Sequence, residues 1–285
     1  DTILDGFNRW KQRKQMVVDT IRSNAPDVVG LKEAENDQVR LIQYAMPQYS
    51  NYAVGRKDGA RKGETCAIFY RKDRFLKLDA GTFWFSDDPY DPGSRDWGAL
   101  WPRICSWVHL LDRKTRTGFY VYNVHMDALS QNSREKSSRM LAAKIAARKT
   151  QDPFIVMGDF NMSAENPAMK HLREMGFQSP TTPFPGTIDA WSSVHFREHK
   201  IGTRHGFRVT TSGPMIAHIR LCDNIVPLEA TIDRRHFDGK YPSDHFPVVA
   251  KVLIKRGSRL TRKVSESQDT TEAAAVKPTA PGSGV

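Results

Sequence analysis

Side chains with catalytic chemistry stand where the apolar stretches of this sequence stop. Carboxylates, a carboxamide and imidazoles follow or precede these stretches throughout the chain. The set comprises Glu33, His125, Asp159, Asn161, Asp223, Asp244 and His245. Taken one at a time, an acidic residue in such a place is most often a turn or helix-cap residue. Taken together, they are the groups that metal-assisted hydrolysis of a phosphate ester requires.

Each kind of group has a task in that reaction. A hard cation such as Mg²⁺ binds one or two carboxylates and keeps several waters, and it polarises the phosphoryl oxygen. A histidine paired with an aspartate activates water or holds the phosphate, and an amide donates hydrogen bonds to the transition-state oxygens. The sequence has no G-x-S-x-G elbow and no cysteine beside a histidine in a recognisable motif. The set therefore predicts direct attack by water, with Mg²⁺ or Mn²⁺ as the cofactor.

The stretch FIVMGDFN (154–161) carries two of these groups two residues apart. Alternate residues of an extended chain point to the same side, so Asp159 and Asn161 are expected to face one phosphate. Gly158 keeps the end of this strand uncrowded.

Short apolar runs alternate with amphipathic helices along the chain. Many strands with few helices between them indicate a two-layer β core flanked by helices. No linker divides residues 1–256, which predicts one domain, and the polar composition of 257–285 predicts a disordered tail. The periodicity predicts helices over 9–24, 132–148 and 167–175, and strands over 27–31, 66–71, 75–86, 104–111, 119–125, 154–158, 221–226 and 246–254.

The order of the motifs resembles the endonuclease/exonuclease/phosphatase superfamily, which includes pancreatic-type DNases, abasic-site endonucleases, sphingomyelinases and inositol polyphosphate 5-phosphatases. The resemblance extends over nearly the whole body and implies an α/β four-layer sandwich, with two β-sheets face to face and helices outside. Three further stretches look closest to small bacterial-type members of unassigned substrate: GTFWFS (81–86), WPRICSW (101–107) and GTRHGF (202–207). The main motifs are DVVGLKEA (27–34), KGETCAIFYR (62–71), YNVHMD (122–127), GDFN (158–161), LCDNIV (221–226) and YPSDHFPVVAKV (241–252).

The resemblance implies roles for the residues that match these motifs. Glu33 matches the family's metal-ligand glutamate, and Asp244 matches an acidic residue near the metal. Asp159 matches the aspartate that orients or activates the attacking water. Asn161 matches the amide that binds the phosphate oxygens.

The remaining matches concern the histidines. His245 matches the catalytic histidine, and Asp223 matches the carboxylate that orients it. His125 occupies the position from which many members contact the phosphate or assist the leaving group. Glu64 matches a recurrent glutamate whose role is less clear and is compatible with a structural one.

Two departures from the family pattern bear on activity. Members begin with a strand ending in an asparagine that helps to set the metal site, and this chain is expected to lack that strand. The residue before the metal glutamate is usually glutamine, but here it is Lys32, and a fixed cation beside a Mg²⁺ site is expected to weaken metal binding. The alternative to an active hydrolase is therefore an impaired member that binds a phosphorylated ligand or a protein partner.

Charge leaves the substrate open between nucleic acid and a small phosphoester or lipid headgroup. The formal net charge is +11, which favours an anionic partner. Trp97, Trp101 and Trp191 look exposed enough to stack on bases, whereas the acidic stretch WFSDDPYDPGSRDW (84–97), expected near the mouth of the site, repels a polyanion. The three cysteines lie far apart and are expected to be buried apolar residues. No apolar run is long enough to span a bilayer, and the sequence makes no prediction of compartment or oligomeric state.

Overall fold

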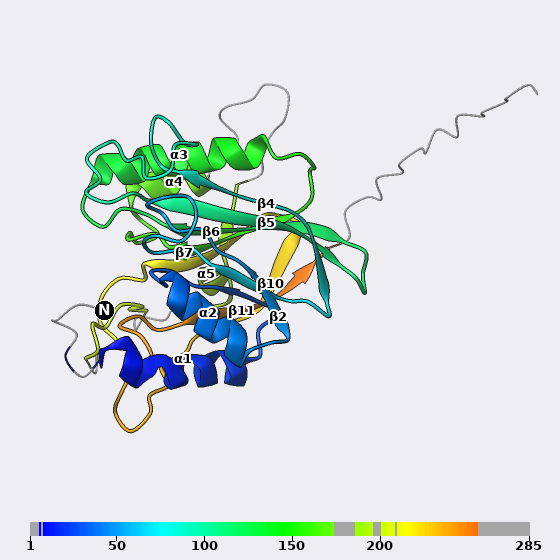
Figure 1. Ribbon diagram of the computed structural model, residues 1–285. Helices are drawn as coiled ribbons and strands as arrows, with labels where there is room; N and C mark the ends of the chain where they lie inside the picture. The colour runs from blue at the N-terminus through cyan, green and yellow to red at the C-terminus, as the bar shows by residue number, and fades with distance from the viewer. Residues whose placement is uncertain (1–5, 7, 174–185, 196–200, 209, 256–285) are drawn as a thin grey trace, which may run out of the picture.

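The chain folds into four layers, with two layers of strands face to face and helices on both outer faces (Figure 1). The computed structural model describes residues 6, 8–173, 186–195, 201–208 and 210–255. The four-layer α/β sandwich expected from the sequence is confirmed. The predicted tail, 257–285, lies outside the described residues, so its disorder and the domain division remain predictions.

The first layer of strands is one six-stranded sheet in the order β4-β5-β6-β7-β9-β8. The strands β6 and β7 pair in parallel, and every other neighbouring pair is antiparallel. Helices α3 (Gln131–Ala146) and α4 (Pro167–Arg173) cover the outer face of this sheet (Figure 1). The strands are β4 (Phe75–Trp84), β5 (Ile104–Asp112), β6 (Gly118–His125), β7 (Phe154–Asp159), β8 (Ile188–Asp189) and β9 (Ala217–Leu221).

The second layer of strands consists of two smaller sheets. One has the order β1-β3-β2 and the other pairs β10 with β11. Helices α1 (Trp10–Asn24) and α2 (Asn36–Ala45) lie on the outer face of this layer (Figure 1), and the short helix α5 (Ala190–Val194) contacts β10. The strands are β1 (Val28–Gly30), β2 (Tyr49–Tyr52), β3 (Ile68–Arg71), β10 (Ile225–Ile232) and β11 (Val248–Ile254).

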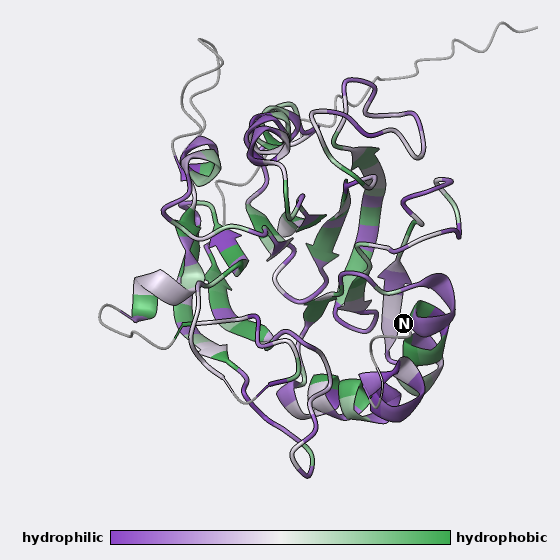
Figure 2. Ribbon diagram, turned by 90° about the vertical axis from the view of Figure 1, so that its left-hand side faces the viewer, coloured by the Kyte–Doolittle hydropathy of each residue, from purple (hydrophilic) through white to green (hydrophobic). Residues whose placement is uncertain are grey.

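Buried apolar side chains fill the spaces between the layers. The cluster between the two layers of strands draws on β3, β4, β5 and β6; its fully buried members include Ile68, Val108, Leu110 and Val121. A second cluster lies under α3 and α4 and a third under α1 and α2. Figure 2 shows hydrophobic residues concentrated on the interior strands, with the loops mostly hydrophilic. Among the helices that the structure describes, none combines the length and the apolar character that a bilayer crossing requires.

A groove separates the two smaller sheets. Among the described residues, β1 pairs with β3 alone and β11 with β10 alone, so each leaves one edge without a strand. A cavity of about 280 Å³ lies between these edges and is lined by Val28–Gly30 on one side and Val248–Ala250 on the other. We call this cavity the β1–β11 groove. The sequence analysis expected a strand to be lacking, and the groove offers two free backbone edges to one.

One element prediction needs correction, and the elements α2, β2, β8 and α5 were not predicted. Residues 221–226 do not form one strand: β9 ends at Leu221, a turn follows, and β10 begins at Ile225. The helix α2 was not predicted, because only Val39 and Ile42 are buried within it and the rest of its sequence is polar or partly exposed. The three cysteines are free and buried, as expected.

Candidate active site

The parallel pair β6 and β7 places His125 beside Asp159. Their register pairs these two residues at the carboxyl ends of the strands, where groups from neighbouring parallel strands meet at one edge of a sheet. The buried side chain of Asn123 ties the opposite layer to this edge, because its Nδ2 donates to the carbonyls of Leu31 (2.9 Å) and Ala67 (3.0 Å). The segment after β1 is thereby held against β6 two residues before Glu33.

Gly158 is required where β7 enters the site. Its φ is +150°, and a Cβ at this position would lie 2.1 Å from the carbonyl oxygen of Val124 in β6. A contact this short with backbone cannot be relieved by a side-chain rotation. The expectation that Gly158 keeps the strand end uncrowded is therefore met by a specific close approach of the two strands.

Asp159 is buried and held in one orientation. Its Oδ1 accepts a hydrogen bond from the backbone N–H of Asn161 at 2.8 Å, and the other carboxylate oxygen remains for the site. Strand β7 ends at Asp159, and Asn161 has a φ of +50°. The extended alternation that was expected to align the two residues therefore stops at Asp159. The Asn161 side chain donates to the carbonyl of Met126 at 2.9 Å, and it does not line the groove that holds Asp159.

His245 reaches Asp159 from the loop before β11. Its Nδ1 lies 3.7 Å from Asp159 Oδ2, and its Nε2 lies 3.9 Å from Asp244 Oδ2. The backbone N–H groups of His205 and Gly206 both donate to the carbonyl of Asp244, at 2.9 and 3.0 Å. The stretch GTRHGF thus fixes the loop that carries His245.

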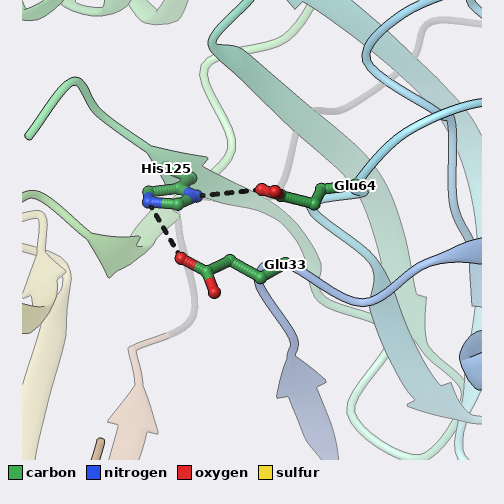
Figure 3. Close-up of side chains that lie close together, drawn as sticks. All are labelled: Glu33, Glu64 and His125. Carbon is green, nitrogen blue, oxygen red and sulfur yellow. Dashed lines mark ion pairs between the residues drawn. The ribbon is translucent and has the colours of Figure 1, made fainter. Parts of the chain in front are cut away.

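Glu33, Glu64 and His125 form a cluster that is suited to a metal ion (Figure 3). One ligand atom of each lies within 4.8 Å of the others. Glu33 Oε1 is 3.7 Å from His125 Nε2, and Glu64 Oε2 is 4.0 Å from His125 Nδ1. Partial burial, together with the carboxylates of Glu64 and Asp244, raises the pKa of Glu33. Such crowding of carboxylates favours a bound cation, so these residues fit a divalent metal. Glu33 also has a φ of +61°, a strained value for a residue other than glycine.

Two buried arginines surround this cluster. Arg103 Nη1 lies 3.0 Å from His125 Nε2, and Arg103 also pairs with Asp127 at 3.3 Å. Arg56 pairs with Glu64 at 2.7 Å. Burial, with the charges of Arg103 and Arg56 nearby, lowers the pKa of His125 well below its ordinary value. His125 is therefore a neutral imidazole at pH 7. Arg103 lies within the motif WPRICSW and Arg56 outside every quoted motif, and the sequence assigned no role to either arginine.

Lys32 lines the same groove as Glu33, Asp159 and His245. Burial lowers the pKa of Lys32, while the charges of Asp159, Cys66 and Glu33 act in the opposite direction. Lys32 is partly buried, so its charge acts on the carboxylates that line the groove.

Asp223 is the one candidate that the structure does not bring to the site. In the register of β7 with β9, Asp159 pairs with Ala217, whereas Leu221 pairs with Ile155 at the opposite end of β7. Asp223 follows Leu221 and is exposed, so it does not orient His245 in this fold. The groups that the structure gathers are Glu33, Glu64, His125, Asp159, Asp244 and His245, with Asn161 adjacent.

The aromatic residues expected to be exposed behave differently from one another. Trp191 is 5% exposed and belongs to a hydrophobic cluster, so its prediction was wrong. Trp101 is 53% exposed and lines a pocket beside Glu33 and His125. Residues 84–97 line neither this pocket nor the β1–β11 groove; Trp97 is hydrogen-bonded to Asp87 and to Ser130 before α3.

Comparison with known proteins gives one family. Residues 4–245 match the model of the Endonuclease/Exonuclease/phosphatase family. The solved structure of a mannosyl-6-phosphatase from Bacteroides thetaiotaomicron is 28% identical, with a TM-score of 0.78, and the match covers 88% of this chain and 95% of that one.

Two curated relatives are more distant. The uncharacterized protein L388 of Acanthamoeba polyphaga mimivirus is 23% identical over 219 residues, which is 74% of this chain and 79% of that protein. The CCR4-Not complex 3'-5'-exoribonuclease subunit Ccr4 of Emericella nidulans is 25% identical over 134 residues, 41% of this chain. The match to Ccr4 spans a fifth of that protein's length.

Proposed function

Since the chain belongs to the Endonuclease/Exonuclease/phosphatase family, with relatives that hydrolyse phosphoesters, we propose that it is a divalent-metal-dependent phosphoester hydrolase in which water attacks phosphorus in line. The observation that carries the proposal is the meeting of Asp159, His245 and Glu33 at one end of the β1–β11 groove. These three carboxylate or imidazole groups come from segments that are far apart in the sequence, and all three line the same groove.

The metal is proposed to be Mg²⁺, with Mn²⁺ as a substitute, held by Glu33 with Asp244 or with Glu64 and His125 nearby. The donor atoms of Glu33, Glu64 and His125 lie close enough together to share one ion. When bound, the ion would polarise the phosphoryl oxygen and neutralise charge that develops during hydrolysis.

The chain's own residues supply the proton transfers and the hydrogen bonds. Asp159, fixed by the N–H of Asn161, is placed to orient the attacking water and accept its proton. His245 donates to a phosphoryl oxygen from the opposite side of the groove, and the amide of Asn161 is proposed to contact the same phosphate. His125, neutral and hydrogen-bonded to Arg103, is proposed to contact the phosphate or the leaving group.

Metal dependence tests the proposal. Hydrolysis of bis(p-nitrophenyl) phosphate and p-nitrophenyl phosphate should require Mg²⁺ or Mn²⁺, stop with a chelator and return when metal is restored. Replacing His245 with alanine should lower kcat by roughly 100-fold or more, the size expected for a lost acid–base or electrostatic group. Activity that persists in chelator, or an unaffected His245→Ala variant, would contradict the proposal.

Lys32 favours one alternative, a member that binds a phosphorylated ligand or a protein partner without turnover. Its charge interacts with Asp159 and Glu33 in the groove that all three line, and it would compete there with a metal cation. Calorimetry distinguishes the two functions: the hydrolase binds Mg²⁺ or Mn²⁺ at a single class of site, and the non-catalytic member binds neither.

A further inference from the structure

A second cavity opens beside the catalytic groups, and we call it the Trp101 pocket. Its volume is about 410 Å³, and its inner wall is formed by Glu33, Glu64 and His125. Glu33 lines both this pocket and the β1–β11 groove, and no other described residue does. A phosphoester whose phosphate lies at Glu33 therefore has room for its organic group in the Trp101 pocket. The pocket is also lined by Glu35, Arg56, Lys57, Gly63, Trp101 and Arg103.

The rim residue Trp101 presents its ring from an anchored loop. Half of it, 53%, is exposed, although an indole is among the side chains that gain most from burial. The loop before it is tied down at Trp97, whose Nε1 donates to Asp87 Oδ1 at 3.0 Å and whose carbonyl accepts from Ser130 Oγ at 2.7 Å. An exposed aromatic ring on an anchored loop at the mouth of a pocket is a preformed stacking surface for a ligand.

The charges of the pocket wall argue against a second anionic group. Arg56 already pairs with Glu64 at 2.7 Å, and Arg103 already pairs with Asp127 at 3.3 Å. The remaining cation, Lys57, lines the pocket together with the carboxylates of Glu33 and Glu35. The wall thus offers balanced donors and acceptors. A nucleic-acid strand needs a net positive track for its phosphates, and this pocket does not provide one.

We propose that the Trp101 pocket binds the sugar ring of a sugar phosphate, with the phosphate at Glu33. The inference rests on the proposed function and names its substrate class. Sugar hydroxyls both donate and accept hydrogen bonds, which suits a wall of mixed carboxylates and guanidinium groups. The C–H face of a pyranose packs on the indole of Trp101. The volume lies within the range of about 300–1,000 Å³ that is typical of small-ligand pockets.

Binding without turnover tests the pocket separately from the hydrolysis. Calorimetry on the full chain carrying Asp159→Asn, in Mg²⁺, should compare glucose 6-phosphate and mannose 6-phosphate with glycerol 3-phosphate, which has no ring. A hexose phosphate should bind roughly tenfold more tightly. The further substitution Trp101→Ala should remove this preference and leave the affinity for glycerol 3-phosphate within about twofold. Tyr90→Ala is the matched control, because Tyr90 is an exposed aromatic residue before Trp101 that does not line the pocket.

Three results would overturn the inference. Equal affinities for ring and ringless phosphates would show that the pocket does not recognise the ring, and a preference that survives Trp101→Ala would place recognition elsewhere. Tighter binding of adenosine 5′-monophosphate or a thymidine oligonucleotide that depends on Trp101 would assign the pocket to a base. If the unsubstituted chain hydrolyses glycerol 3-phosphate with Mg²⁺ but shows no ring preference, the proposed function stands and this inference fails. If ring-dependent binding occurs without hydrolysis of any phosphoester, this inference stands and the proposed function fails.

Discussion

Replacing Gly158 with alanine tests how closely β6 and β7 must approach to hold Asp159 in place. The added Cβ would lie 2.1 Å from the carbonyl oxygen of Val124 and 2.8 Å from its backbone nitrogen and from its Cγ2. These are atoms of a paired strand, so the strands themselves must separate. Asp159, the next residue, would move with the backbone.

The magnitude has two parts. A φ of +150° lies in a region that is essentially reserved for glycine, and an alanine held there costs about 1–3 kcal/mol. Overpacking of a well-packed interior adds about 1–3 kcal/mol, and here the upper end applies because the closest atom is backbone. We expect Gly158→Ala to lower the free energy of unfolding by about 4–6 kcal/mol, with a loss of kcat/KM in the fraction that remains folded.

Gly213 provides the matched control for this measurement. Its φ is +107°, but an added Cβ meets nothing within 4 Å, so Gly213→Ala carries the conformational cost without the collision, about 1–3 kcal/mol. Urea denaturation of both variants measures the difference. If Gly158→Ala and Gly213→Ala are equally destabilised, and Gly158→Ala keeps full activity, the close approach does not position Asp159 and the reasoning is refuted.

Three further predictions concern the buried cation, an acid limb of stability and the groove. Lys32→Gln should raise the affinity for Mg²⁺, measured by calorimetry, roughly tenfold or more. The reason is that two unit charges a few ångströms apart repel each other by a few kcal/mol at an effective dielectric of about 20. An unchanged affinity would mean that the ammonium group does not face the ion. Burial acts to raise the pKa of Asp189, but the hydrogen bond to His218 at 3.0 Å and the charge of His218 hold that pKa below its ordinary value. The carboxylate of Asp189 therefore stabilises the fold above pH ~4, and this stabilisation is lost as the pH falls below that value. Asp189→Asn should therefore lower the free energy of unfolding at pH 7 by about 3 kcal/mol and flatten its decline below pH 4, and a parallel decline in both proteins would contradict this. An eight-residue apolar β-strand appended before Asp1 should raise Tm by about 5 °C, because it can pair with the free edges of β1 and β11. An extension of the same length that contains prolines should leave Tm unchanged. Equal effects of the two extensions on Tm would show that the groove does not accept a strand.

Much of the site could be predicted from the sequence because its residues stand at the ends of strands that local patterns identify. Asp159 and His125 follow apolar runs, and these runs are neighbouring parallel strands whose carboxyl ends meet. The polar ends of the strands are therefore informative once the strands are placed correctly. Glu33 follows β1 and His245 precedes β11, and both of these strands were predicted at nearly the observed limits.

Asp223 shows where local patterns fail. LCDNIV looks like one strand, but the chain turns at residues 222–224, and the strand β9 before it contains His218 and Arg220. Both side chains can be buried because residues distant in the sequence form hydrogen bonds with them. Asp189 is the partner of His218, and Thr187 is the partner of Arg220. A polar side chain that is buried through a partner about 30 residues away cannot be distinguished locally from a surface residue.

The buried arginines were missed for the same reason. In the sequence, Arg103 and Arg56 look like surface cations. Only the folded chain pairs Arg103 with Asp127 and Arg56 with Glu64, next to His125. Extended alternation was expected to align Asn161 with Asp159, but Asn161 has a left-handed backbone and lies beyond the end of β7. Its role at the phosphate, which the resemblance to the family implies, stays a prediction. Contacts between residues distant in the sequence determine where these side chains lie, and the periodicity of the sequence does not reveal such contacts.

The most direct test of the account is a paired measurement of kcat/KM for Asp159→Asn and Asp223→Asn in Mg²⁺ with a simple phosphodiester. Both substitutions exchange one carboxylate oxygen for an amide nitrogen, but Asp159 lies within 3.7 Å of His245 and Asp223 lies beyond the opposite end of the strand pair. The account predicts a loss of at least about 100-fold for Asp159→Asn and a change within about twofold for Asp223→Asn. Comparable activity in the two variants, or a larger loss for Asp223→Asn, would contradict the site that we describe.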